Sequence, residues 1–264
     1  MRAKPARAMR DLRAAPFLAK MLYDSRMNAS FRGRRVAFFG GSFDPPHLGH
    51  LAVARAARAA LGLDAVLFAP VGAQPLKPLG ATASFDTRLA MTRLAIAGEP
   101  GFEVSLADAP KSSGEPNYTL ETLLTLHAGL PPASILFCLM GADSFMALRH
   151  WRRAAEIPFV APLIVASRPG EPLDDLRAAL PRGLTMETAP SPNSCAGGVE
   201  MRRWDLINQA GERTPFYLLP GLNVDVSASG IRKQVRAELG SPAAEHELLP
   251  QSVADYIRTH GLYR

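Results

Sequence analysis

The chain has 264 residues, of which 47% are hydrophobic, so it can bury a substantial core within one domain. Its longest apolar runs, residues 135–140 and 159–166, fall far short of the roughly 18 residues that a membrane-spanning helix needs, which argues against a membrane protein. Cys138 and Cys195 lie in very different settings and indicate neither a disulfide framework nor a zinc site. These features predict a cytoplasmic protein with no membrane partner.

The positive charge is concentrated at the beginning of the chain. The formal net charge is +6, but residues 1–35 hold ten Lys or Arg and two Asp or Glu, and the remaining residues hold 20 Lys or Arg and 22 Asp or Glu. We expect residues 1–33 to be a basic leader, either disordered or upstream of a true start at Met27. A transit peptide, or an arm that touches nucleic acid or a membrane, would have a similar composition. Because the rest is slightly acidic, a nucleic-acid partner is disfavoured.

The first elements after the leader are predicted to be a strand, a glycine turn and a helix. Residues 36–39 are apolar and strand-forming, Gly40 and Gly41 permit a turn, and residues 48–61 repeat small and apolar residues at helical spacing until Gly62. This order directs unpaired backbone N–H groups and the positive end of the helix dipole toward the space above the turn. It therefore predicts a phosphate site.

Two histidines, His47 and His50, fall at the start of this helix. They are three residues apart and lie on one helical face, so both imidazoles can reach the same anion. Gly49 between them leaves room for a base or a phosphate group. A glycine pair alone indicates only a generic α/β turn with histidines that cap and pack. The complete run 40–50, which includes Phe-Asp-Pro-Pro, is much more specific and favours a nucleotide site.

Strands and helices then alternate along the chain. Strands are predicted at residues 65–71, 102–105, 134–140 and 159–167, and helices at residues 84–98, 119–129 and 144–151. This alternation predicts the α/β class, with a doubly wound parallel sheet covered by helices on both faces. Ligands bind such sheets outside the carboxyl ends of the strands, where Gly41, Asp143 and Arg168 are expected to converge.

The last part of the chain is less regular. Residues 188–215 are rich in Pro, Ser, Gly and Arg, which predicts a long surface loop or lid in which Trp204 is a packing residue. Residues 227–232 open a helix, and a final helix begins near Pro250. We therefore expect one domain over residues 34–264.

Several short motifs occur together in one order. Besides residues 40–50 and 227–232, they are Pro-Leu-Lys-Pro at 75–78, Asn-Tyr-Thr-Leu-Glu-Thr-Leu at 117–123, Gly-Ala-Asp-Ser at 141–144 with Trp151 downstream, and Ser-Arg-Pro-Gly at 167–170. They resemble the signatures of the nucleotidyltransferase superfamily, and most closely those of the bacterial nicotinate-nucleotide adenylyltransferases. The resemblance spans about residues 34–264. It implies a Rossmann-like fold and an enzyme of NAD biosynthesis that joins ATP to nicotinate mononucleotide, giving deamido-NAD and pyrophosphate.

The resemblance also implies roles for individual residues. His47 and His50 would be catalytic as hydrogen-bond donors to the ATP phosphates, because a phosphate nucleophile needs neither a general base nor a covalent intermediate. The residues implied to bind ATP are Gly41, Ser42, Phe43, Gly49, Lys77, Asp143, Arg168, Ser229, Ile231 and Arg232. Those implied to bind nicotinate mononucleotide are Tyr118, Thr119 and Trp151. No carboxylate cluster suits a metal, so Mg²⁺ would be held mainly by ATP phosphates and water.

Some features depart from the family pattern. The family places an acidic residue and an arginine ahead of its Tyr-Thr motif, whereas residues 106–116 here are Leu-Ala-Asp-Ala-Pro-Lys-Ser-Ser-Gly-Glu-Pro. Ser229 stands where threonine is common. Taken without the resemblance, Trp151 is a core residue, Thr119 is a helix cap and Arg168 is a solvated strand end.

Other functions remain as alternatives. A related adenylyltransferase would act on nicotinamide mononucleotide or phosphopantetheine, although the phosphopantetheine enzymes typically have threonine in place of His47. A class I aminoacyl-tRNA synthetase would carry a Lys-Met-Ser-Lys-Ser stretch, which is missing here. A different class is a non-catalytic nucleotide- or RNA-binding protein that uses the basic leader. The sequence does not fix the oligomeric state, and a homo-oligomer is compatible with it.

Overall fold

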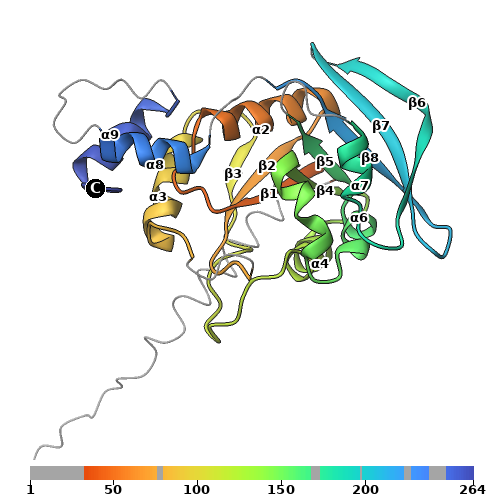
Figure 1. Cartoon of the computed structure of the whole chain (residues 1–264), viewed down its shortest axis with the longest axis horizontal. Helices are drawn as coiled ribbons and strands as arrows, with labels where there is room; N and C mark the ends of the chain where they lie inside the picture. The colour runs from red at the N-terminus through yellow and green to blue at the C-terminus, as the bar shows by residue number, and fades with distance from the viewer. Residues whose placement is uncertain (1–32, 76–79, 168–172, 197, 223–226, 238–247) are drawn as a thin grey trace, which may run out of the picture.

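The computed structural model describes residues 33–75, 80–167, 173–196, 198–222, 227–237 and 248–264. They form an eight-stranded sheet with helices on both faces (Figure 1). No helix among these residues combines the length and the apolar character that crossing a bilayer requires. Residues 1–32 of the predicted leader, Lys77 and Arg168 lie outside the described residues.

Within the described ranges, six strands run parallel and make up the sheet from its β3 edge to β8. They are β1 (Arg35–Gly41), β2 (Ala65–Pro70), β3 (Phe102–Val104), β4 (Ile135–Gly141), β5 (Leu163–Ala166) and β8 (Arg213–Leu219). Their spatial order is β3-β2-β1-β4-β5-β8, with every neighbouring pair parallel. The chain reverses its direction of winding between β1 and β4, which is where such a sheet leaves an opening for a ligand. The predicted doubly wound α/β fold is confirmed.

Strand β1 shows why these residues form the centre. Val36 and Phe38 pack in the hydrophobic cluster on one face of the sheet, and Ala37 and Phe39 pack in the cluster on the other. All four side chains are at most 6% exposed. A strand with both faces buried is apolar throughout, whereas a half-buried strand alternates.

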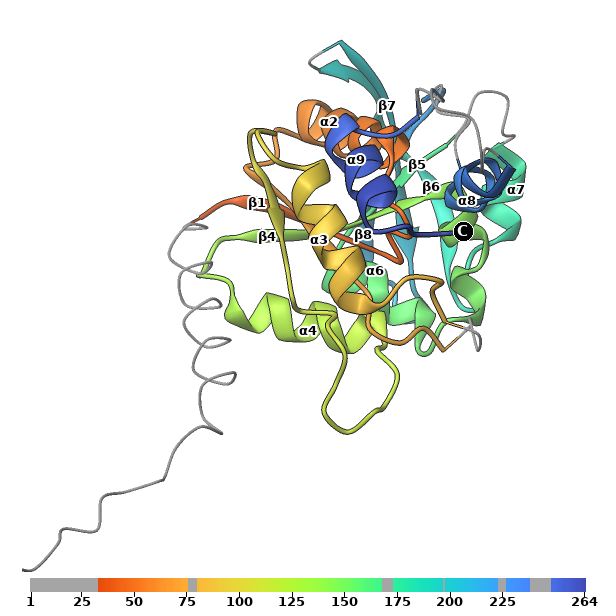
Figure 2. The same cartoon turned by 90° about the vertical axis from the view of Figure 1, so that its left-hand side faces the viewer.

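Helices cover both clusters. The helices are α2 (Leu48–Leu61), α3 (Phe85–Ala95), α4 (Thr119–Gly129), α5 (Ala142–Met146), α6 (Ile157–Val160), α7 (Leu173–Ala178), α8 (Ala228–Ala237) and α9 (Gln251–Thr259), with short 3₁₀ helices η1 (Leu148–His150) and η2 (Ala154–Glu156). α2, α3 and α9 pack on one face of the sheet, where α3 and α9 lie side by side (Figure 2), and α4 to α6 pack on the other. The bounds of α2 and α4 agree with those predicted.

The segment 188–215 is not the surface loop that its composition predicts. Residues 185–196 form β6 (Thr185–Ala196), which pairs antiparallel with β7 (Val199–Ile207), and β7 pairs antiparallel with β8. The register of β6 shifts between Thr188 and Asn193, and two prolines fall in that interval. A bulge at a sheet edge accommodates prolines, which have no N–H for the ladder. The hairpin extends away from the body of the molecule (Figure 1).

The strand predicted at residues 159–167 is shorter than expected. Residues 157–160 form α6, and β5 begins only at Leu163. Pro158 explains the difference, because proline fits the first turn of a helix and cannot donate to the interior of a sheet. Trp204 on β7 is 6% exposed and packs in the core, as predicted.

Candidate functional site

A cavity of about 1110 Å³ lies at the carboxyl ends of β1 and β4, at the switch point of the sheet. Its walls include the starts of α2, α4, α5 and α8. The predicted site residues that line it are Gly41, Ser42, Phe43, His47, Gly49, His50, Tyr118, Thr119, Asp143, Trp151, Ser229 and Arg232. Segments that are far apart in the sequence therefore meet in one space.

Ile231 is a predicted ATP contact that the structure does not bring to the cavity. Its side chain is 3% exposed and packs in the hydrophobic core. Its backbone N–H donates at 3.0 Å to the carbonyl of Ser227, the residue before α8. Ile231 thus anchors the helix in the core, while Ser229 and Arg232 of the same motif line the cavity.

The glycine pair does not form the turn that the sequence predicts. Gly40 and Gly41 are the last residues of β1, and neither has a positive φ angle. A Cβ atom at Gly40 would lie 2.8 Å from the Phe38 ring and would force that ring to move, and a Cβ atom at Gly41 would lie 3.2 Å from the Phe43 ring, which is a tight contact. Phe43 itself makes the turn, with a φ of 48° that is uncommon for a bulky residue.

The ring of Phe43 holds this backbone conformation in place. It is 2% exposed, and its centroid lies 5.6 Å from those of Phe39 and Phe68 and 4.9 Å from that of His50. Burying such a ring contributes about 1.5–3 kcal/mol, which is enough to offset a backbone cost of about 1–3 kcal/mol. The Phe43 ring therefore packs against the His50 ring and helps to hold it in place.

The two histidines are fixed relative to each other. His47 is the N-cap of α2, and its ring stacks on that of His50 with 3.7 Å between centroids. The backbone N–H of His47 donates to Nδ1 of His50 at 3.1 Å. Because Nδ1 accepts a hydrogen bond, the proton of the neutral ring lies on Nε2. His50 is thus oriented as an Nε2–H donor.

The charge state of His50 follows from its surroundings. Burial, and then the neighbouring His47, lower the pKa of His50 well below its ordinary value of about 6.5. At pH 7 the ring is therefore neutral. The backbone N–H groups of His47, Leu48 and His50 already donate within the protein. The site therefore offers the Nε2–H of His50 to an anion, beside the positive end of the α2 dipole.

Asp44 holds the loop before the histidines, a role that its sequence context does not reveal. The carboxylate is 3% exposed and accepts hydrogen bonds from the backbone N–H groups of Thr82 at 2.6 Å and Ala83 at 3.2 Å. It also accepts from the hydroxyl of Tyr263 at 2.7 Å. Nη1 of Arg232 donates to the Asp44 carbonyl at 2.6 Å, so this predicted phosphate ligand is also tied to the loop.

Arg88 is a second buried group without a signal in the sequence. Its guanidinium donates to the carbonyls of Ser42 at 2.6 Å, Val71 at 2.9 Å and Ala83 at 3.2 Å. The residue is 2% exposed, and burial lowers its pKa from the ordinary value. Since these carbonyls follow β1 and β2 and precede α3, Arg88 joins three segments that border the cavity.

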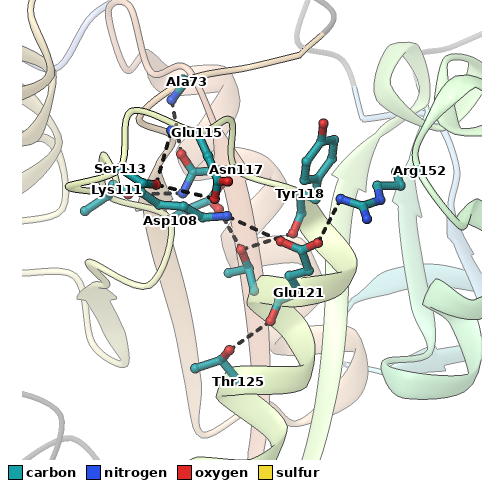
Figure 3. Close-up of polar contacts among 12 residues, drawn as sticks. Ala73, Asp108, Lys111, Ser113, Glu115, Asn117, Tyr118, Glu121, Thr125 and Arg152 are labelled. Carbon is teal, nitrogen blue, oxygen red and sulfur yellow. Dashed lines mark hydrogen bonds and ion pairs between the residues drawn. The ribbon is translucent and has the colours of Figure 1, made fainter.

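A second polar cluster lies beside α4 (Figure 3). Asp108 is 6% exposed and accepts from the hydroxyl of Thr122 at 2.7 Å. The Asn117 side chain accepts from the backbone N–H of Ala73 at 3.2 Å and donates to the carbonyl of Ala109 at 3.0 Å. These bonds tie the loops after β2 and β3 to the start of α4. Segment 106–116, which departs from the family motif, is therefore fastened at both ends.

Asp108 predicts a pH dependence of stability. Burial raises its pKa to about 6, whereas an aspartate in an unfolded chain titrates near 3.9. The folded protein binds this proton more tightly, so the free energy of unfolding falls as the pH rises from about 4 to about 6. Asp108→Asn keeps an acceptor for Thr122 and should raise the free energy of unfolding at neutral pH by about 2–3 kcal/mol.

Urea unfolding across this pH range measures the effect. The exposed Asp86→Asn in α3 is the matched control, because it removes the same charge at a solvent-exposed position. An Asp108→Asn protein with the same pH slope as the original chain would contradict the raised pKa.

Tyr118, Thr119 and Trp151 line one part of the cavity. Tyr118 is the N-cap of α4, Thr119 is its first residue, and Trp151 follows η1. Trp151 is half-buried and packs against the core cluster on that face. The first N–H groups of α4 and a large aromatic ring thus border the same space.

Asp143 and Ser229 stand at two other helix starts. Asp143 lies in the first turn of α5, directly after β4, and Ser229 lies in the first turn of α8. The Ser227 hydroxyl caps α8 by accepting from the backbone N–H of Gly230 at 3.1 Å. Among the residues that the structure describes, no group of three or more His, Cys, Asp and Glu side chains is arranged to hold a metal.

The chain is similar to a known family and to curated proteins. Residues 38–234 match the cytidylyltransferase-like family model. A Gloeobacter violaceus protein named as a probable nicotinate-nucleotide adenylyltransferase is 37% identical over 88% of this chain and 97% of that protein. A Xylella fastidiosa protein with the same name is 36% identical over 86% of this chain and 95% of that protein.

Solved structures share the fold. A nicotinic acid mononucleotide adenylyltransferase of Plasmodium falciparum, solved as a complex with NaAD, has a TM-score of 0.60 to this chain. The sequence identity is 16%, and the alignment covers 87% of this chain and 97% of that chain. At this identity the similarity shows a common fold.

Proposed function

The chain belongs to the nicotinate-nucleotide adenylyltransferases of the cytidylyltransferase-like family, and from this we propose that it transfers the adenylyl group of ATP to nicotinate mononucleotide, giving deamido-NAD and pyrophosphate in NAD biosynthesis. One observation carries the assignment of the site. The stacked histidines at the start of α2 and the aromatic residues near α4 line a single cavity at the switch point. One space can therefore hold two nucleotides side by side.

The proposed reaction needs positioning more than activation. A phosphate oxygen of the mononucleotide attacks the α-phosphorus of ATP, a P–O–P bond forms, and pyrophosphate leaves with the electron pair of the broken bond. The attacking phosphate is already anionic at neutral pH, so no base must remove a proton. His50 would donate from Nε2 to a phosphate oxygen as negative charge builds on it, with His47 and the end of α2 beside it.

The remaining ATP contacts follow from the walls of the cavity. Gly41 and Gly49 would leave space for the nucleotide, and Ser42 and Ser229 would offer hydroxyls. Arg232 has further N–H donors for a phosphate besides the one that binds Asp44. Lys77 and Arg168 stay predictions as phosphate ligands, because they lie outside the described residues.

Magnesium would be held mainly by ATP phosphates and water. It prefers oxygen ligands and retains several waters, and when bound it neutralises phosphate charge. Among the described carboxylates of the cavity, Asp44 and Asp108 are buried and hydrogen-bonded inside the protein, whereas Asp143 is exposed. Asp143 is therefore the carboxylate that we assign to a ribose hydroxyl or to a magnesium-bound water.

The pyridine end of the mononucleotide would lie near α4. The Trp151 ring would stack on the pyridine, and Thr119, with the first N–H groups of α4, would bind its carboxylate. Tyr118 completes this part of the cavity. The position of these residues on one wall supports the assignment.

Pyrophosphate release from purified protein with ATP and magnesium tests the proposal. We expect turnover with nicotinate mononucleotide to exceed turnover with nicotinamide mononucleotide and phosphopantetheine. Turnover with phosphopantetheine alone would assign a different acceptor. Protein that is folded but inactive with all three acceptors would overturn the proposal.

Deleting residues 1–33 separates the enzyme from a nucleic-acid-binding protein. A catalyst built on residues 34–264 should keep its kcat, because the described cavity contains no residue from the leader. A nucleic-acid binder should lose its affinity together with its salt dependence. We also place the enzyme in the cytoplasm, a reducing compartment that suits the buried free thiol of Cys138.

A further inference from the structure

We propose that Arg152 is a specificity-determining residue whose guanidinium joins Thr119 in binding the pyridine carboxylate of the mononucleotide and so selects nicotinate over nicotinamide. This rests on the proposed function. No sequence motif named above includes Arg152, and it follows directly after Trp151.

The distribution of cations in the cavity supports this role. Among the described residues that line it, Arg152 and Arg232 are the two with permanent positive charge. Arg232 lies on α8 and donates to Asp44 in the loop before the histidines. Arg152 instead lies next to Trp151 and Tyr118. Arg232 lies with the proposed triphosphate contacts, so Arg152 is the cation in position to bind an anion at the pyridine end.

The guanidinium of Arg152 is held in place before any ligand binds. Its Cζ lies 4.7 Å from the centroid of the Tyr118 ring, a cation–π contact. Its Nη1 lies 3.2 Å from a carboxylate oxygen of Glu121 (Figure 3). The side chain is 57% exposed, so it keeps an accessible face. A planar guanidinium fixed in this way can bind a carboxylate through two parallel hydrogen bonds.

Glu121 does not cancel the charge of Arg152, because it is shared between two cations. Its other carboxylate oxygen lies 3.3 Å from Nζ of Lys111 (Figure 3). One carboxylate between two cations leaves this group with a net charge of +1. That charge attracts a carboxylate, whereas a neutral carboxamide gains much less from it.

Steady-state kinetics of Arg152→Gln with both mononucleotides test the proposal. We expect KM for nicotinate mononucleotide to rise on the order of tenfold, with a smaller change in kcat and an unchanged KM for nicotinamide mononucleotide. The KM of Arg152→Lys for nicotinate mononucleotide should lie between the values of the original protein and of Arg152→Gln, because lysine keeps the charge and loses the paired hydrogen bonds. Arg149→Gln is the matched control, because Arg149 is exposed on η1 and does not line the cavity.

Two outcomes would overturn the role. Equal rises in KM for both mononucleotides would place Arg152 on the phosphate that they share, and unchanged values for both would remove it from the site. Calorimetric titration of the same proteins with each mononucleotide gives the selectivity independently of turnover. A chain that binds nicotinate mononucleotide selectively through Arg152 but releases no pyrophosphate would refute the proposed reaction alone.

Discussion

Replacing His50 with alanine should lower kcat by on the order of a hundredfold or more while leaving the fold intact. The reason is the fixed Nε2–H donor, which in the proposed reaction would face a phosphate oxygen whose negative charge grows in the transition state. Such a donor stabilises the transition state more than bound ATP, so KM for ATP should change less than kcat. Steady-state pyrophosphate release measures both constants, and circular dichroism checks the fold.

Two further variants sharpen the result. His50→Gln keeps an amide N–H donor on a flexible side chain and should recover part of the lost kcat. His127→Ala removes an exposed histidine of α4 that does not line the cavity, and it should be close to neutral. An effect of His50→Ala confined to KM would contradict a role in the transition state.

Asp44→Ala should lower the free energy of unfolding by about 3–5 kcal/mol. The substitution leaves the N–H groups of Thr82 and Ala83 and the hydroxyl of Tyr263 without their acceptor inside the protein. Each such group costs about 1–3 kcal/mol when it is buried and unsatisfied. Burial raises the pKa of Tyr263, so its hydroxyl stays protonated and remains a donor that has lost its acceptor.

Urea unfolding at pH 7 measures this change, and activity should fall with it because the loop before the histidines loses its anchor. Asp255→Ala is the matched control, since Asp255 is a partly exposed carboxylate of α9 paired with Arg258. A surface pair of this kind contributes about 0–1 kcal/mol. Equal losses in the two variants would show that the buried hydrogen bonds around Asp44 add no stability.

Local sequence patterns predicted much of the fold and most of the walls of the cavity. The bounds of α2 and the Ser84 cap of α3 follow from periodicity and capping chemistry, which act over a few residues. The position of His47 at the cavity followed from its motif, and that of Trp151 followed from the resemblance to a known family. The hairpin β6–β7 was not predicted, because its prolines and polar residues are typical of loops and its pairing depends on β8.

The sequence also did not predict the side-chain contacts that hold the site together. Nothing local distinguishes Arg88, in the middle of a helix, from a solvated arginine, yet its partners lie up to 46 residues away. Arg152 looks like one of several arginines in a short basic run. Its position on Tyr118 depends on how α4 packs near η1. Such contacts depend on the tertiary fold, so hydrophobic patterns and secondary-structure propensities do not predict them.

The hydrogen bond between Tyr263 and Asp44 also orders events during synthesis. The two residues are 219 positions apart in the chain. At about 5–20 residues per second, a ribosome needs roughly 10–40 s to pass from one to the other. During that time the Asp44 carboxylate has only the N–H groups of Thr82 and Ala83 as partners, so the histidine loop lacks its last anchor. We therefore expect a nascent chain to reach its full nucleotide affinity only when residue 263 has emerged from the ribosome.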